Sequence, residues 1–80
     1  MRSTPCRLGR MPHNDLCFDN DSVSSRHAEV HYLSDGSFQI FDLGSTNGTW
    51  VNGQRIQNQF LKNGDVVELG EVRLHFRVGD

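Results

Sequence analysis

Arginine and small hydroxyl residues gather in three short clusters that could together bind an anion. The clusters are Gly9-Arg10, Ser24-Ser25-Arg26-His27 and Gly44-Ser45-Thr46-Asn47-Gly48. A guanidinium donates hydrogen bonds in a planar fork that matches phosphate oxygens, and hydroxyl groups donate to the same oxygens. A run of small residues also lets several backbone N–H groups point at one anion. The clusters therefore hold the donors that a phosphate monoester requires, although the same residues also suit solvated charges beside an ordinary turn.

Turn dipeptides divide the chain at short intervals, which predicts that short strands carry these clusters. The dipeptides are Asp35-Gly36, Asn47-Gly48, Asn52-Gly53 and Asn63-Gly64. Gly and Asn favour such turns because they adopt positive φ at low cost. No window of a dozen residues has the apolar spacing of a helix. The pattern predicts an all-β sandwich or barrel.

Apolar and polar residues alternate between these turns, as in strands with one buried face. The expected strand residues include Ala28, Val30 and Tyr32, Phe38 and Ile40, Trp50 and Val51, Val66, Val67 and Leu69, and Val72, Leu74, Phe76 and Val78. The first fifteen residues are less regular, and we interpret residues 1–7 as an irregular end that precedes a loop around Pro12-His13-Asn14-Asp15. The 80 residues are expected to form a single domain, residues 1–80.

Composition excludes several classes of function. The net charge of −2 and the pI near 6.0 argue against a sequence-independent nucleic-acid binder, which needs an excess of Lys and Arg. No apolar run reaches the length of about 18 residues that a membrane span requires, and the N-terminus lacks the apolar stretch of a signal peptide. We therefore expect a cytoplasmic protein that binds neither nucleic acid nor membrane, with Cys6 and Cys17 as free thiols.

The residues do not favour a metal site or a hydrolase site. His27 and His31 lie four residues apart, which on a strand separates them by about 13 Å, too far for one metal ion. Ser24 and His27 with an aspartate could be arranged as a hydrolase triad, but the sequence has no nucleophile elbow and no oxyanion loop. We expect no metal, no cofactor and no catalysis.

Four ordered blocks of the sequence resemble the forkhead-associated (FHA) domain. They are Gly9-Arg10, the segment from Val23 to Val30 with Ser24 and His27, the segment from Asp42 to Gly53, and Leu61 to Gly70. The resemblance implies a sandwich of two antiparallel sheets whose loops at one end bind phosphothreonine in an extended peptide. It implies a non-catalytic module for phosphorylation-dependent protein–protein interaction in signalling.

The resemblance also implies a role for each site residue. Arg10 and Ser24 would contact the phosphate, and Thr46 would lie near it. Asn47 would hydrogen-bond the peptide main chain, while Ser25 and Arg26 would also face the peptide. Gly9, His27 and Gly48 would support the site structurally. Family members often carry Asn or Arg where this chain has Ser25, so we expect one peptide contact to be weaker or missing.

The N-terminal end differs from the family pattern. The family has about two strands before the Gly-Arg block, whereas this chain has only Met1 to Leu8 there. We therefore expect shortened or missing N-terminal strands, an exposed sheet edge that could form a homodimer, or a fragment of a longer protein. The alternative function is a phosphate-independent scaffold that assembles through strand exchange or dimerisation.

Overall fold

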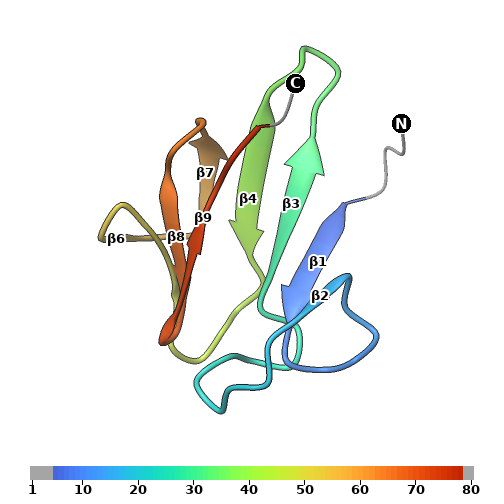
Figure 1. Ribbon diagram of the computed structural model, residues 1–80, viewed down its shortest axis with the longest axis vertical. Coiled ribbons are helices and arrows are strands. Elements are labelled where there is room, and N and C mark those ends of the chain that lie inside the picture. The colour runs from blue at the N-terminus through green and yellow to red at the C-terminus, as the bar shows by residue number, and fades with distance from the viewer. Residues whose placement is uncertain (1–4, 79–80) are drawn as a thin grey trace.

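Two β-sheets pack face to face in the computed structural model, which describes residues 5–78 (Figure 1). One sheet has the strand order β2-β1-β3-β4-β7 and the other the order β6-β5-β8-β9. The strands are β1 (Cys6–Gly9), β2 (Leu16–Cys17), β3 (Ala28–Tyr32), β4 (Phe38–Asp42), β5 (Thr49–Val51), β6 (Gln54–Ile56), β7 (Asn58–Leu61), β8 (Val66–Leu69) and β9 (Val72–His75). Residues 5–78 contain no helix, and hence none that could cross a membrane. The predicted all-β sandwich is confirmed.

One strand pair departs from the expected antiparallel arrangement. Strands β1 and β2 are parallel, with Leu8 opposite Leu16 and Gly9 opposite Cys17, whereas the other pairs are antiparallel. The Asp15 carboxylate accepts a hydrogen bond of 2.8 Å from the backbone N–H of Arg7. The β1–β2 loop therefore folds back along β1 until Asp15 lies beside Arg7. Strand β2 starts from there and runs in the same direction as β1.

The expectation of an irregular end over residues 1–7 is wrong for Cys6 and Arg7. Both belong to β1, which pairs along β3 from Cys6 opposite Val30 to Leu8 opposite Ala28. Only four residues long, β1 contains too few inward positions for its alternation to stand out in the sequence. Residues 1–4 of the expected irregular end lie outside the described residues, and β1 is the one described strand before Arg10.

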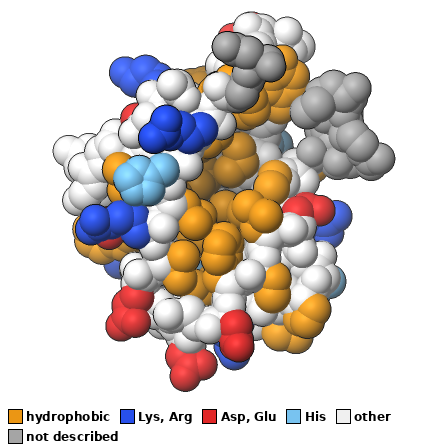
Figure 2. All heavy atoms as spheres, in the orientation of Figure 1, with side chains coloured by type: hydrophobic (Ala, Val, Ile, Leu, Met, Phe, Trp, Pro, Cys, Tyr) orange, Lys and Arg blue, Asp and Glu red, His pale blue; other side chains and the backbone are white. Residues whose placement is uncertain are grey.

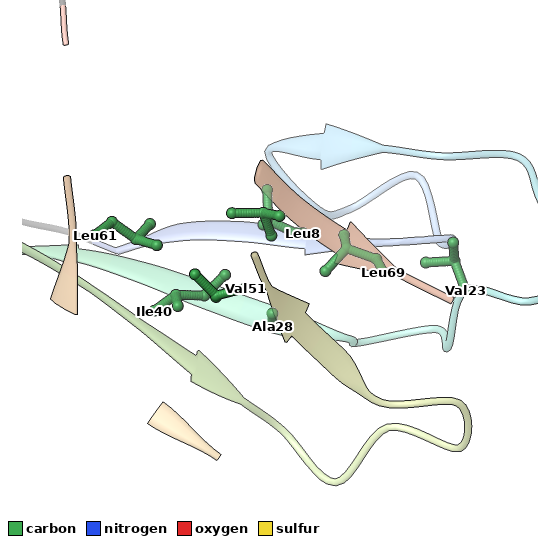
Figure 3. Packing of buried hydrophobic residues seen from close by; sticks show 8 residues of the cluster. Leu8, Val23, Ala28, Ile40, Val51, Leu61 and Leu69 are labelled. Carbon is green, nitrogen blue, oxygen red and sulfur yellow. The ribbon is translucent and has the colours of Figure 1, made fainter. Parts of the chain in front are cut away.

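The core is formed by the inward faces of both sheets and by one loop residue (Figure 3). Its buried members are Leu8, Val23, Ala28, Ile40, Val51, Leu61, Val67 and Leu69. In Figure 3 the cluster extends from Leu61 at one end to Val23 at the other. Val23 is only 1% exposed although it lies between β2 and β3. Val78, expected to continue the inward face of the last strand, lies beyond β9 and is exposed.

The core is open on one side, between β1 and β9. A hollow of about 390 Å³ lies there, lined mainly by apolar side chains that include Leu8, Ile40, Val67, Leu74 and Phe76. Figure 2 shows hydrophobic side chains, in orange, as a band across the middle of this face of the molecule. Among residues 5–78, strand β9 is the last strand of its sheet and pairs only with β8. No described strand therefore pairs with the other edge of β9, which lies beside the apolar trough.

Four connections meet at one end of the sandwich, the lower end in Figure 1. They are the β1–β2 loop (residues 10–15), the β2–β3 loop (residues 18–27), the β4–β5 loop (residues 43–48) and the β8–β9 turn (residues 70–71). Loops held by a rigid sandwich are common positions for binding groups. All three clusters singled out in the sequence lie at this end.

Candidate functional site

Direct hydrogen bonds join the loops that carry the predicted site residues. The backbone N–H of Arg10 donates to the Ser24 carbonyl at 3.0 Å, and the backbone N–H of Thr46 donates to the Ser24 hydroxyl at 3.1 Å. The Asn47 side-chain amide donates to the Ser22 carbonyl at 2.8 Å. The structure therefore brings Arg10, Ser24, Thr46 and Asn47 together at the lower end of the sandwich.

The Arg10 side chain is exposed, and one hydrogen bond fixes its orientation. Its Nε donates to the carbonyl oxygen of Val23 at 3.1 Å, and Val23 is anchored in the core. A guanidinium has five N–H donors, so this bond leaves the two terminal nitrogens for a ligand. Arg10 thus presents a fork of donors beside Ser24.

The Ser24 hydroxyl has a defined direction. Its oxygen accepts the hydrogen bond from Thr46 N–H, and no described residue accepts its proton. A hydroxyl can accept and donate at once. Ser24 can therefore donate to an anion bound between the β2–β3 and β4–β5 loops while it holds Thr46 in place.

His27 is fully buried, with 0% of its surface exposed, and both ring nitrogens are used. Nδ1 accepts a hydrogen bond from Ser24 N–H at 3.1 Å, so it carries no proton, and Nε2 is 2.8 Å from the carbonyl oxygen of Gly48. Nε2 is therefore the donor of a neutral ring.

Within the described part of the chain, no three His, Cys, Asp or Glu side chains are grouped as metal ligands.

Gly9 lies where the β1–β2 and β2–β3 loops touch. A Cβ atom placed there would overlap the carbonyl oxygen of Ser25 and lie 2.6 Å from Nδ2 of Asn14. The Asn14 amide donates to the carbonyls of Met11 at 2.9 Å and Ser25 at 2.7 Å. Sequence reasoning missed this supporting role of Asn14, because an Asn in a short polar segment carries no signal of which loop it will join.

Asp42 organises the β4–β5 loop. Its carboxylate accepts hydrogen bonds from the backbone N–H groups of Gly44 and Ser45 and from the hydroxyls of Ser45 and Thr49. Burial raises the pKa of Asp42, but the hydrogen bonds from Ser45, Thr49 and Gly44 together outweigh it and hold the pKa below its usual value. Sequence reasoning noted Asp42 at the head of its block without assigning it a role.

Gly48 closes the same loop. Its φ of 90° lies in the left-handed region that favours glycine, and a Cβ there would lie 2.7 Å from Nε of Arg55. Its N–H donates to the Ser45 hydroxyl, and its carbonyl accepts from His27 and, at 3.3 Å, from Gly70 N–H. One residue therefore links the β2–β3 loop, the β4–β5 loop and the β8–β9 turn.

Ser25 and Arg26 are exposed on the β2–β3 loop between the anchored residues Ser24 and His27. The Ser25 backbone carbonyl is held by Met11 N–H and by Asn14. No hydrogen bond joins the side chain of either residue to another described residue. Their positions are fixed by the backbone, while their side chains face solvent.

Ser22 joins its own loop to the β4–β5 loop and to the β8–β9 turn, a role that the sequence did not indicate. Its carbonyl accepts from Asn47, its hydroxyl accepts from Glu71 N–H at 2.8 Å, and both its N–H and its hydroxyl donate to the Asn20 side chain. Beside it lies a hollow of about 340 Å³ lined by Ser22, Asn47, Trp50, Glu68, Gly70 and Glu71. Nothing in the local sequence around Ser22 indicates contacts with residues so far along the chain.

Comparison with known proteins finds similarity over most of the chain. A family model of the FHA domain matches residues 6–70. The glycogen accumulation regulator GarA of Mycolicibacterium smegmatis is 46% identical over 71 residues, which are 89% of this chain and 44% of that protein. The chain therefore spans less than half the length of that relative.

Solved structures share the fold. One, from a structural and functional analysis of phosphothreonine-dependent FHA domain interactions, has a TM-score of 0.91 at 31% identity and covers 100% of this chain and 82% of that chain. The N-terminal FHA domain of S. cerevisiae Rad53p, in complex with a phosphothreonine peptide, has a TM-score of 0.78 at 34% identity and covers 89% of this chain and 61% of that one. With a family model that matches most of its length, this chain belongs to the FHA domain family.

Proposed function

We propose that this FHA domain binds phosphothreonine-containing peptides of partner proteins and so mediates phosphorylation-dependent interaction. The observation that supports this most directly is the convergence of Arg10, Ser24 and Thr46, held together by the hydrogen bonds to Ser24. A tetrahedral dianion needs several donors from different directions. The related Rad53p domain is similar in fold and binds a phosphothreonine peptide.

Each residue has a distinct role in this proposal. The terminal nitrogens of Arg10 and the hydroxyl of Ser24 bind phosphate oxygens, and Thr46 lies beside them. Asn47 binds the peptide main chain through its side-chain oxygen and the second N–H of its side-chain amide, which the bond to Ser22 leaves free. Arg26 adds positive charge at the rim, and Ser25, with its short side chain, contributes the weakest contact.

Affinity is expected to be modest. Each charge-assisted hydrogen bond contributes about 1.5–3 kcal/mol, while association costs at least about 4 kcal/mol. Two or three such bonds reach the micromolar range only with help from neighbouring peptide contacts. The domain is therefore a reversible reader of phosphorylation.

The geometry of the Ser24–His27 pair supports a non-catalytic role. A serine nucleophile needs a base within hydrogen-bond reach of its hydroxyl. Here the His27 ring accepts from the backbone N–H of Ser24, and its other nitrogen is occupied by Gly48. The imidazole therefore positions the loop and cannot take the Ser24 hydroxyl proton.

Titration with a phosphothreonine peptide and its unphosphorylated counterpart tests the proposal. We expect phosphate-dependent binding that Arg10→Ala weakens about tenfold or more. Arg77→Ala is the matched control, because Arg77 is exposed beyond β9 and away from the binding loops. Equal binding of both peptides, or unchanged binding by Arg10→Ala, would contradict the proposal.

A second candidate function is homodimer formation through the free edge of β9. The trough of about 390 Å³ beside this edge supports it, because an unpaired strand next to exposed apolar surface favours pairing with another chain. This contact lies away from Arg10 and Ser24, so it needs no phosphate. A single monomeric species across a wide concentration range in analytical ultracentrifugation would exclude it.

We place these interactions in the cytoplasm, where protein kinases phosphorylate threonine. Immunofluorescence or cell fractionation of the natural protein checks this location. Recovery of the protein only outside the cytoplasm would contradict it.

A further inference from the structure

The apolar trough between β1 and β9 has a basic rim. Its volume is about 390 Å³, and its lining side chains are hydrophobic apart from those of His75 and Arg77. No Asp or Glu of the described residues lines it. Figure 2 shows basic and histidine side chains beside the orange band. The trough therefore combines an apolar floor with positive charge along β9.

Side chains alternate regularly from the start of β9 to the residues just beyond it. The half-buried residues that pack against the core are Val72, Leu74 and Phe76. The exposed residues that follow them in alternation are Arg73, His75 and Arg77. A strand added beside β9 has the same period of two residues. Its inward side chains would therefore enter the trough, and its outward side chains would lie beside the basic residues.

The backbone bonds of Phe76 show which groups of β9 face the free edge. Phe76 N–H donates to the Asp65 carbonyl, and the Phe76 carbonyl accepts from Gly64 N–H, both at 2.8 Å. Both backbone groups of Phe76 therefore point toward the β8 side. Because these directions alternate along a strand, the backbone groups of His75 and Arg77 point toward the free edge.

The other end of β9 follows the same alternation. The backbone N–H of Glu71 donates to the Ser22 hydroxyl on the β2–β3 loop and not to β8. Among residues 5–78, no hydrogen bond outside the β8–β9 ladder involves the backbone of Arg73, His75 or Arg77. Unpaired backbone groups in such a row are a template for the addition of a further strand.

The charge along this edge favours an acidic occupant. Arg77 forms no ion pair with another described residue, and Arg73 has one exposed partner, Glu68, at 3.5 Å. Antiparallel pairing of β9 with β9 of a second copy, centred on His75, would place Arg73 opposite Arg77. Like charges directly opposite each other destabilise a strand pair, whereas opposite charges stabilise it. A strand that carries carboxylates therefore matches this edge better than a second β9 does.

We propose that β9 and the apolar trough bind an extended segment of a partner protein in which apolar residues alternate with Asp or Glu. The segment adds to β9 as a strand, its apolar side chains enter the trough, and its carboxylates lie beside Arg73 and Arg77. No residue of the four loops at the lower end lines the trough. This interaction is therefore separate from the proposed phosphothreonine site and needs no phosphate.

A synthetic strand peptide tests the proposal. The probe is a fluorophore-labelled Glu-Val-Glu-Leu-Glu-Val-Glu peptide with blocked ends, and the comparison peptide has Lys in place of every Glu. In fluorescence anisotropy titrations we expect the Glu peptide to bind about three- to tenfold more tightly than the Lys peptide, because exposed charge pairs are individually weak. Added salt should reduce this preference.

Backbone pairing has its own measurement. Two versions of the Glu peptide carry N-methyl groups on one or the other alternate set of backbone amides, and only one set faces β9. Methylation of the facing set should abolish binding, while the other set should retain it. In hydrogen exchange followed by NMR, the Glu peptide should protect the amide protons of His75 and Arg77.

Two double variants separate the β9 edge from general electrostatics. Arg73→Gln with Arg77→Gln should reduce the preference for the Glu peptide toward onefold. Arg7→Gln with Arg55→Gln is the matched control, because it removes the same charge from exposed positions on β1 and β6. The control should keep the full preference. Arg10→Ala should weaken phosphopeptide binding and leave the affinity for the Glu peptide unchanged.

The possible outcomes decide between occupants. No binding of the Glu peptide by the folded protein, or equal affinity for the Glu and Lys peptides, would overturn the proposal. A preference that persists in the Arg73→Gln, Arg77→Gln double variant would also overturn it. Without peptide, a dimer in ultracentrifugation with protected His75 and Arg77 amides would identify a second copy as the occupant instead. Failure of phosphopeptide binding alone would overturn only the phosphothreonine function.

Discussion

Nε2 of His27 donates to the carbonyl oxygen of Gly48, 2.8 Å away, and this bond joins the β2–β3 loop to the β4–β5 loop. The other ring nitrogen accepts from Ser24 N–H. A buried ring with two occupied nitrogens fixes the spacing between the loop that carries Ser24 and the loop that carries Thr46 and Asn47. His27 therefore fixes the relative position of the two loops that carry the proposed site.

His27→Ala should lower the free energy of unfolding by about 2–5 kcal/mol. The change removes a fully buried side chain and leaves Ser24 N–H without its acceptor, while the Gly48 carbonyl keeps only the 3.3 Å bond from Gly70 N–H. A buried polar group left unpaired costs about 1–3 kcal/mol, and the lost packing adds to this. Urea unfolding measures the change. His75→Ala, at an exposed position on β9, should change it by less than about 0.5 kcal/mol. Similar stabilities for the two variants would show that the His27 bonds contribute little.

Gly9→Ala should destabilise the protein and weaken phosphopeptide binding together. The added methyl group meets the Ser25 carbonyl and the Asn14 side chain, and such overpacking costs about 1–3 kcal/mol. The β2–β3 loop must shift, which moves Ser24 away from Arg10. Thermal unfolding and peptide titration measure the two effects.

The control is Gly36→Ala at the turn between β3 and β4. Its φ of 90° makes alanine strained, but no atom lies within 4 Å of the added methyl group. It should lower stability by about 1–2 kcal/mol and leave phosphopeptide affinity unchanged in the folded protein. Equal losses of affinity in both variants would attribute the effect of Gly9→Ala to stability alone.

Asp42 should make stability depend on pH in the acid range. Because hydrogen bonds hold its folded-state pKa below the unfolded value of about 3.9, its stabilising contribution is present above that pH and is lost as pH falls through the folded pKa. Asp42→Asn should reduce this dependence. At pH 7 the variant should lose about 1–3 kcal/mol of unfolding free energy, because Gly44 and Ser45 N–H groups lose a carboxylate acceptor.

Asp65→Asn is the control that separates the effect of Asp42→Asn on stability from its effect on phosphopeptide binding. The backbone N–H of Lys62 and the amide of Asn52 lower the pKa of Asp65, so this carboxylate contributes to acid sensitivity with the same sign. It lies between β7 and β8, away from the binding loops. Denaturant unfolding from pH 2 to 7 should show a reduced pH dependence in each variant. Titrations at pH 7 should show reduced phosphopeptide affinity only in Asp42→Asn.

Ser24→Ala should weaken phosphopeptide binding more than Ser25→Ala. The first variant removes the proposed donor to phosphate and the acceptor of Thr46 N–H, which should cost about 1.5–3 kcal/mol. Ser25 is exposed, and the loop uses its backbone carbonyl rather than its hydroxyl, so its change should cost less than about 0.5 kcal/mol. Isothermal titration calorimetry with one phosphopeptide ranks the two, and the reverse order would reassign the phosphate contact.

Alternation and turn residues were sufficient to predict most strands. They identify β3, β4, β5 and β8 because each has clear inward positions next to an Asn-Gly or Asp-Gly turn, and those glycines have positive φ in the structure. Strand β1 was missed because its pairing with β3 depends on residues about twenty positions away. Nor can a local pattern predict that β2 returns parallel to β1, since the bond from Arg7 N–H to Asp15 decides it.

In the site too, local patterns were visible in the sequence and contacts between distant residues were not. Arg10, Ser24, Thr46 and Asn47 stand out by type and by their place in loops. Asn14, Ser22 and Asp42 support them through bonds between loops, and a polar residue shows no local sign of such a bond. The sequence therefore indicated the residues proposed to bind the peptide, and did not indicate the residues that hold their loops in place.

Buried and exposed residues alternate along the β2–β3 loop. Val23 and His27 are buried, whereas Asp21, Ser25 and Arg26 are exposed. Exposed positions can change without removing core contacts, and buried positions fix the path of the backbone between them. For protein engineering this makes the loop a natural place to randomise. Libraries at Asp21, Ser25 and Arg26, with Val23 and His27 kept, would sample new peptide preferences on an unchanged scaffold.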